Sequence, residues 1–94
     1  MKFLALEREL PDTTAKAFQP LLKEEARGVW KLQQSGALRE IYFTEQHTAV
    51  LMLECSDIDA ARALLARLPL VQAGLITFDV IPLVPYDGYA RLFV

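Results

Sequence analysis

Residues 13–36 read TTAKAFQPLLKEEARGVWKLQQSG and predict the helix around which the rest of the chain is arranged. At about 100° per residue, Leu22, Val29 and Leu32 fall within about 80° of one another, which is the apolar stripe of an amphipathic helix. Glu25 falls inside this stripe, between Val29 and Leu32. A carboxylate directed at a core needs a partner, a ligand or a proton. Glu25 is therefore the first candidate functional residue.

Three features modify this helix. Pro20 disfavours helical geometry at the residue before it, so the helix is expected to begin near Pro20 or to kink there. Asp12, Thr13 or Thr14 can supply the N-cap. Gly28 costs about 1 kcal/mol relative to Ala in mid-helix, and close approach of another backbone would explain its presence.

The segments on either side of this helix alternate between strand and helix patterns. The pattern of apolar residues predicts strands at residues 2–10, 38–45, 48–55 and 75–83. A tight turn at Gln46-His47 joins the middle two strands. A second helix is predicted at residues 57–68, opening with Ser56 and ending at Pro69. The order β-α-β-β-α-β is that of the ferredoxin-like α+β fold, with a four-stranded antiparallel sheet.

The length and the apolar content predict one domain, residues 1–94, that binds a second copy of itself. Hydrophobic residues make up 53% of the 94 positions, and helices cover only one face of such a sheet. Because the strands are apolar on both faces, we expect a homo-oligomer that pairs through the second sheet face. The tail at residues 85–94 ends in Leu92-Phe93-Val94 and is expected to pack on a neighbouring subunit.

Charge and composition exclude several classes of partner. A net charge of −2 without a basic patch predicts no nucleic-acid partner. No apolar run approaches the ~20 residues of a membrane span, so no membrane association is expected. The N-terminal MKFLALEREL meets charge too early for a signal peptide, and the lone Cys55 forms no internal disulfide. We therefore expect a cytoplasmic protein.

Glu25 has three possible environments that differ in their energetic consequences. If it is a desolvated general acid–base in a cleft, Glu25→Leu should raise stability by about 1 kcal/mol while abolishing activity. If it is the buried partner of Arg39, the same change should cost about 3–5 kcal/mol. If it points to water, the effect should stay within about 0.5 kcal/mol.

The other candidate site residues are Arg39, Tyr42, Trp30 and His47. Arg39 could bind an anionic substrate or neutralise Glu25, and Tyr42 and Trp30 could line a pocket or belong to the core. His47 lies in a turn, where it could contact a ligand or only solvent. One His and one Cys do not make a zinc site, so no metal is expected. Without a phosphate loop, GxSxG or CxxC motif, acid–base chemistry or simple ligand binding remains.

Three segments, KEEARGVWKLQQSG (23–36), LREIY (38–42) and LPLVQAGLITFDVIPL (68–83), resemble the muconolactone isomerase-like members of the dimeric α+β barrel superfamily. The YciI-like proteins are more loosely similar, and the resemblance covers residues 22–83. By position, Glu25, Arg39 and His47 fall where the isomerases also carry Glu, Arg and His. The isomerases carry His and Arg where this chain has Glu40 and Phe43, which weakens the case for their carboxylate-bearing lactone as the substrate.

The resemblance implies a function as well as a fold. We expect two chains to pair into a dimeric α+β barrel that binds a small molecule. The implied activity is cofactor-free proton transfer on a lactone or a related carbonyl compound, with Glu25 as the catalytic group and Arg39, Tyr42, Trp30 and His47 binding the substrate. The alternative is a non-catalytic ligand-binding or assembly module of the same fold.

Overall fold

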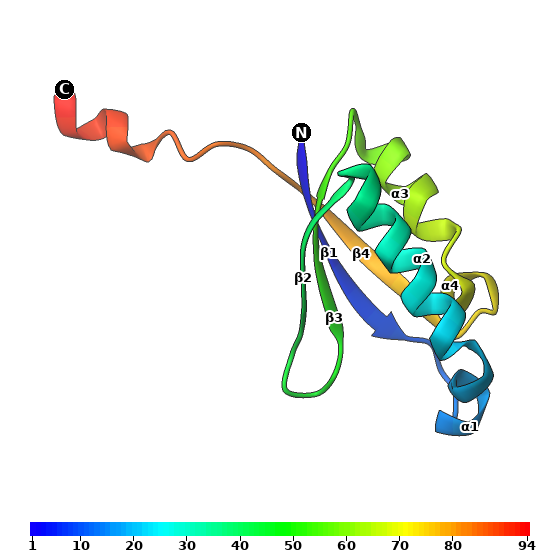
Figure 1. Ribbon diagram of the computed structural model, residues 1–94. Coiled ribbons are helices and arrows are strands. Elements are labelled where there is room, and N and C mark those ends of the chain that lie inside the picture. Colours follow the sequence, from blue (N-terminus) through cyan, green and yellow to red (C-terminus); the bar gives the residue numbers. More distant parts are fainter.

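The computed structural model describes residues 1–94 and contains a single four-stranded antiparallel sheet with its helices on one side (Figure 1). The strands are β1 (Lys2–Glu9), β2 (Leu38–Phe43), β3 (Ala49–Glu54) and β4 (Ile76–Leu83), in the spatial order β2-β3-β1-β4. The main helices, α2 (Leu22–Ser35) and α3 (Ile58–Ala66), connect the strands in the order β-α-β-β-α-β. The predicted ferredoxin-like fold is confirmed.

The first helical segment is interrupted at Pro20, as its sequence predicts. A short helix α1 (Ala15–Phe18) and a 3-10 turn η1 (Gln19–Leu21) precede α2. The side chain of Thr14 caps α1 by accepting a hydrogen bond from the amide of Ala17. Gly36 ends α2 with φ of 86°, a left-handed conformation that glycine adopts without strain.

The second helical segment differs from its prediction at both ends. Asp57, not Ser56, is the N-cap of α3, because its carboxylate accepts from the amide of Ala60. At the other end α3 stops at Ala66, before Pro69, and Pro69 begins a short helix α4 (Pro69–Gln72). Proline is well suited to the first position of a helix, where its missing N–H is not needed.

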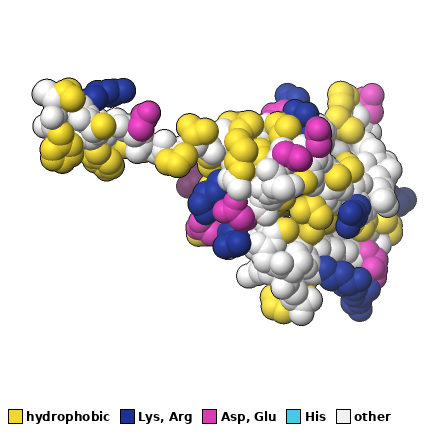
Figure 2. Space-filling view, turned by 90° about the horizontal axis from the view of Figure 1, so that it is seen from above, with side chains coloured by type: hydrophobic (Ala, Val, Ile, Leu, Met, Phe, Trp, Pro, Cys, Tyr) yellow, Lys and Arg dark blue, Asp and Glu magenta, His cyan; other side chains and the backbone are white.

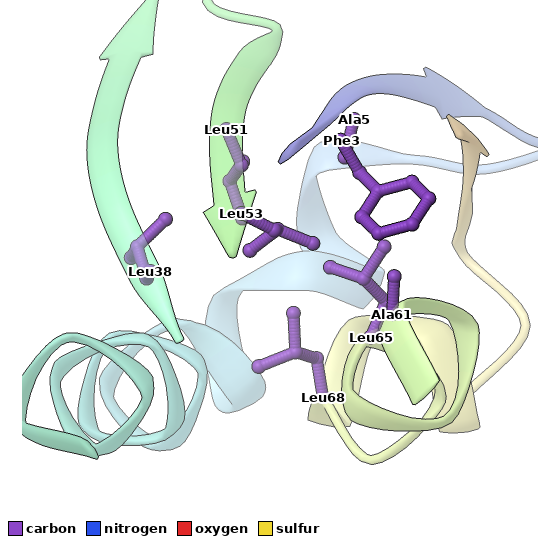
Figure 3. Close-up of a cluster of buried hydrophobic side chains, with 8 residues drawn as sticks. All are labelled: Phe3, Ala5, Leu38, Leu51, Leu53, Ala61, Leu65 and Leu68. Atoms are coloured by element: carbon purple, nitrogen blue, oxygen red, sulfur yellow. The ribbon is translucent and has the colours of Figure 1, made fainter. Parts of the chain in front are cut away.

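The core lies between the sheet and the helices (Figure 3). In the register of the sheet, Phe3 of β1 lies opposite Leu53 of β3, and Ala5 lies opposite Leu51, so these four side chains share the helix-facing side. Ala61 and Leu65 of α3 and the following Leu68 pack against them. The helix-facing side of β1 is thus the one that begins with Phe3 and Ala5.

The other side of the sheet carries no helix (Figure 1). Leu4 is paired with Met52 on one side and with Ile81 on the other, so these apolar side chains lie together on the uncovered face. The expectation that both faces of the sheet are apolar is met, whereas pairing with a second copy stays a prediction.

After β4 the chain leaves the domain as an extended segment that ends in a 3-10 helix η2 (Gly88–Phe93) (Figure 1). Apolar side chains gather at the end of this tail (Figure 2), and Leu92 and Phe93 are 76% and 84% exposed. None of the helices has the length and apolar character needed to cross a membrane.

Candidate functional site

An open cavity of about 590 Å³ lies between α2 and the end of the sheet at which β1 finishes and β4 begins. In Figure 1 this is the end near α1, α4 and the β2–β3 turn, opposite the end from which the tail departs. Thirteen of the 18 lining residues are hydrophobic. The lining comprises Glu7, Glu9, Phe18, Leu22, Glu25, Ala26, Val29, Trp30, Gln33, Ile41, Phe43, His47, Ala49, Leu51, Leu68, Leu70, Ile76 and Phe78.

Glu25 lies in this cavity, half-buried on the sheet-facing side of α2. Its Oε1 atom accepts a hydrogen bond of 2.9 Å from the backbone N–H of Leu70. Because Leu70 is at the second position of α4, its N–H has no partner within that helix. The carboxylate therefore caps a helix from a distant part of the chain, and its second oxygen makes no hydrogen bond.

Three effects act on the proton affinity of Glu25. Burial raises its pKa above the ordinary value for a glutamate, and the nearby carboxylate of Glu7 raises it as well, whereas the hydrogen bond from Leu70 opposes both. Burial is the largest of the three. When the pKa of a carboxyl group is raised toward neutral pH, the group becomes better able both to take up and to return a proton.

Two further carboxylates, Glu7 and Glu9, line the same cavity and did not stand out in the sequence. Both follow Phe3 and Ala5 on the helix-facing side of β1, since side chains two apart in a strand share a face. Glu7 accepts a 2.7 Å hydrogen bond from the amide of Ala49, just beyond the β2–β3 turn. The signal that could have located them was the strand alternation.

Trp30 and His47, both predicted site residues, also line the cavity. Trp30 lies on α2 and is 57% exposed, which places it at the rim. His47 is held in the turn by a 2.9 Å bond from its N–H to the carbonyl of Thr44, and its backbone has φ of 61°. Its ring lies 5.2 Å from that of Phe43, centroid to centroid.

Arg39 and Tyr42 do not line the cavity. The Nε of Arg39 donates a 2.6 Å hydrogen bond to the carbonyl of Gly36, and the alternative in which Arg39 pairs with Glu25 is not observed. The hydroxyl of Tyr42 donates to the carboxylate of Glu40 at 2.9 Å, and Tyr42 pairs with Val50 on the uncovered sheet face. A role for either residue in substrate binding stays a prediction.

No group of three or more His, Cys, Asp or Glu side chains converges closely enough to hold a metal ion. The lining offers three carboxylates, one imidazole and one amide, from Gln33, against an apolar background. Such a site can bind a small organic molecule and exchange a proton with it.

The arrangement of sheet and helices is the fold of the muconolactone isomerase-like proteins, as the sequence resemblance implied. The crystal structure of a muconolactone isomerase superposes with a TM-score of 0.71 at 21% identity, covering 94% of this chain and 93% of the other. A second similar structure is that of a 5-chloro-2-hydroxyhydroquinone dehydrochlorinase from Burkholderia phenoliruptrix in complex with 2,5-dihydroxybenzoquinone. It superposes with a TM-score of 0.67 at 16% identity, covering 94% of this chain and 98% of the other. Both are enzymes that act on small molecules.

At these identities the similarity establishes the fold alone. No family model matches the sequence. A search of curated proteins found no match either.

Proposed function

We propose that this protein is a cofactor-free enzyme that transfers a proton on a small carbonyl compound of lactone type, with Glu25 as the general acid–base. The observation that carries the proposal is the position of Glu25, a half-buried carboxylate in an open, mostly apolar cavity. The two enzymes that share the fold act on small molecules, which supports the same broad class.

The reaction requires only a proton shift. The free oxygen of Glu25 would remove a proton from the carbon next to the carbonyl while the electron pair forms the enol or enolate. Return of that proton to a different carbon moves the double bond, so no oxidant or reductant is consumed. Trp30, Gln33 and His47 are the lining side chains that can donate a hydrogen bond to the carbonyl oxygen, where negative charge develops.

The alternative function is a non-catalytic ligand-binding or assembly module. One observation favours it: the bond from Leu70 gives Glu25 a structural reason to be present, independent of chemistry. Against it, the cavity is open and Glu25 has no cationic partner, which is the arrangement that acid–base chemistry requires.

Hydrogen–deuterium exchange tests the proposal without knowledge of the natural substrate. The protein would be incubated in D₂O with a small enolisable lactone, 5-methylfuran-2(3H)-one, and incorporation of deuterium followed by proton NMR. General acid–base catalysis typically contributes ~10²–10⁴-fold. Glu25→Gln should therefore lower the catalysed exchange rate by about 10²-fold or more.

Glu24→Gln is the matched control. Glu24 is the neighbouring residue on α2, is exposed and pairs with Arg27 outside the cavity. This variant should exchange at the rate of the unmodified protein. Equal rates for the Glu25→Gln variant and the unmodified protein would contradict the proposal and favour the assembly module.

A further inference from the structure

The distribution of charge in the cavity restricts what it can bind. We infer that the cavity excludes carboxylates and other anions and takes an uncharged, mostly apolar molecule, any hydrogen-bond donor of which can pair with the lining carboxylates. This inference rests on the proposed function, since it concerns the same site and narrows its substrate to uncharged carbonyl compounds.

The first support is the sign of the lining charges. Glu7, Glu9 and Glu25 all contribute to the lining, and none of the 18 lining residues is Lys or Arg. Glu7 lies near enough to Glu25 for its carboxylate to raise the pKa of Glu25, although burial of Glu25 has the larger effect. A ligand carboxylate entering the same space would meet the same repulsion.

The cations of the neighbouring elements lie outside the cavity lining. Arg27 pairs with Glu24 on the outer side of α2, and Arg39 donates to the carbonyl of Gly36. Lys16 of α1 lines an adjacent surface groove rather than the cavity itself. A ligand carboxylate would therefore find no guanidinium or ammonium group with which to form a charge-assisted pair.

The remaining lining defines the rest of the ligand. Its apolar majority, which includes Phe18, Val29 and Phe78, suits a ring or short hydrocarbon. Carboxylates accept hydrogen bonds, so a hydroxyl, amide or amine on the ligand can pair with the Glu9 side chain or with the free oxygen of Glu25. A volume of about 590 Å³ accommodates a substituted single ring.

Benzamide and benzoate test the inference because they have the same shape and differ in charge. Trp30 is the only tryptophan of the chain and lies at the cavity rim, so its fluorescence reports ligand binding there. Each carboxylate within about 10 Å should weaken the binding of an anion by about tenfold. We expect benzamide to bind at least about tenfold more tightly than benzoate at low salt, with the ratio falling as salt is added.

Charge-neutralising variants locate the effect. Glu9→Gln, at an exposed residue whose side chain makes no hydrogen bond, should strengthen benzoate binding by about tenfold and change benzamide binding far less, because glutamine loses the charge but keeps an acceptor oxygen. Glu7→Gln/Glu9→Gln should strengthen it further, with folding checked by circular dichroism. Glu40→Gln removes the same charge from the uncovered sheet face and should change neither affinity.

Benzoate binding as tight as benzamide binding overturns the inference, and so does the absence of binding by either probe. Neither of these binding results decides whether Glu25 catalyses deuterium exchange, because that exchange is measured separately. Selective benzamide binding without any Glu25-dependent exchange would support the inference and reject catalysis instead.

Discussion

The carboxylate of Glu25 on α2 accepts a hydrogen bond from the backbone amide of Leu70 on α4, 45 residues further along the chain, with an oxygen–nitrogen distance of 2.9 Å. This one contact links the two helices that bound the cavity. It also holds the carboxylate in place while one of its oxygens stays free. Glu25 can therefore have a structural and a chemical role together.

The hydrogen bond changes what a substitution at Glu25 should do to stability. Glu25→Leu would leave the N–H of the buried Leu70 without its partner, and the loss of a helix cap costs about 1 kcal/mol. We expect Glu25→Leu to lower the free energy of unfolding by about that amount in urea titrations. Glu25→Gln keeps an acceptor oxygen and should be no less stable than the unmodified protein at neutral pH. A Glu25→Leu variant more stable than the unmodified protein would show that the cap contributes nothing.

Much of the fold follows from local sequence signals. Pro20 and Thr14 mark the break and the cap in the first helical segment because their effects involve only adjacent backbone groups. Strand order and the apolar faces follow from alternation and from the ferredoxin-like connection pattern. The helix α4 was not anticipated, because Pro69 is as compatible with the start of a helix as with its end.

The site was harder to predict because it depends on pairing between distant segments. Helical spacing located Glu25, but its partner is a backbone amide, which no side-chain pattern reveals. An irregularity in the β2–β3 register between Leu38 and Glu40 falls at Arg39, whose side chain instead donates to Gly36. Of the environments that the sequence left open for Glu25, pairing with Arg39 is thus not the one observed.

A second prediction concerns pH. The pKa of Glu25 is raised on folding, so below its unfolded-state pKa the group is protonated in both states. As the pH rises through the folded-state pKa, the unfolded chain ionises first, and the stability that Glu25 contributes is lost. The free energy of unfolding of the unmodified protein should thus fall relative to that of Glu25→Gln as the pH rises from about 4, and it should level off once the pH has passed the raised folded-state pKa of Glu25.

The difference between these two proteins isolates Glu25 from the other titratable groups that face the cavity. Glu7, Glu9 and His47 are present in both proteins, so the comparison reports the effect of removing the Glu25 carboxyl group alone. Urea titrations at several pH values provide the measurement. A constant difference across the range would mean that Glu25 titrates alike in the folded and unfolded states.

A third prediction uses Gly28, where a Cβ atom would lie 3.2 Å from Cδ2 of Leu68. Ala normally stabilises a helix by about 1 kcal/mol relative to Gly. Because Leu68 is buried and cannot easily move, Gly28→Ala should give no gain or a loss of up to about 1 kcal/mol. In a Leu68→Val variant, which lacks the Cδ2 atom, Gly28→Ala should raise the free energy of unfolding as it does in an ordinary helix. A full gain in the unmodified background would refute the close approach.

A fourth prediction concerns pairing of two chains through the uncovered sheet face. Leu4, Met52 and Ile81 lie together on that face, and a second sheet would remove them from water. Met52→Glu places a charge beside Leu4 in this apolar area and should convert a dimer into a monomer in analytical ultracentrifugation. Lys31→Glu, on the exposed surface of α2, is the control and should leave the dimer intact. A monomeric unmodified protein at micromolar concentration would contradict the prediction.

The last prediction concerns the tail. Residues 86–94 extend away from the domain (Figure 1), and Leu92, Phe93 and Val94 are exposed. The buried core lies entirely within residues 3–76. Deleting these residues should therefore leave the secondary structure unchanged. If the tail packs on a neighbouring subunit, the deletion should reduce the oligomer size or lower the melting temperature, because the apolar contacts between subunits are lost. Sedimentation and thermal unfolding at matched concentrations measure both. Identical values for the shortened and full-length chains would show that the tail has no part in assembly.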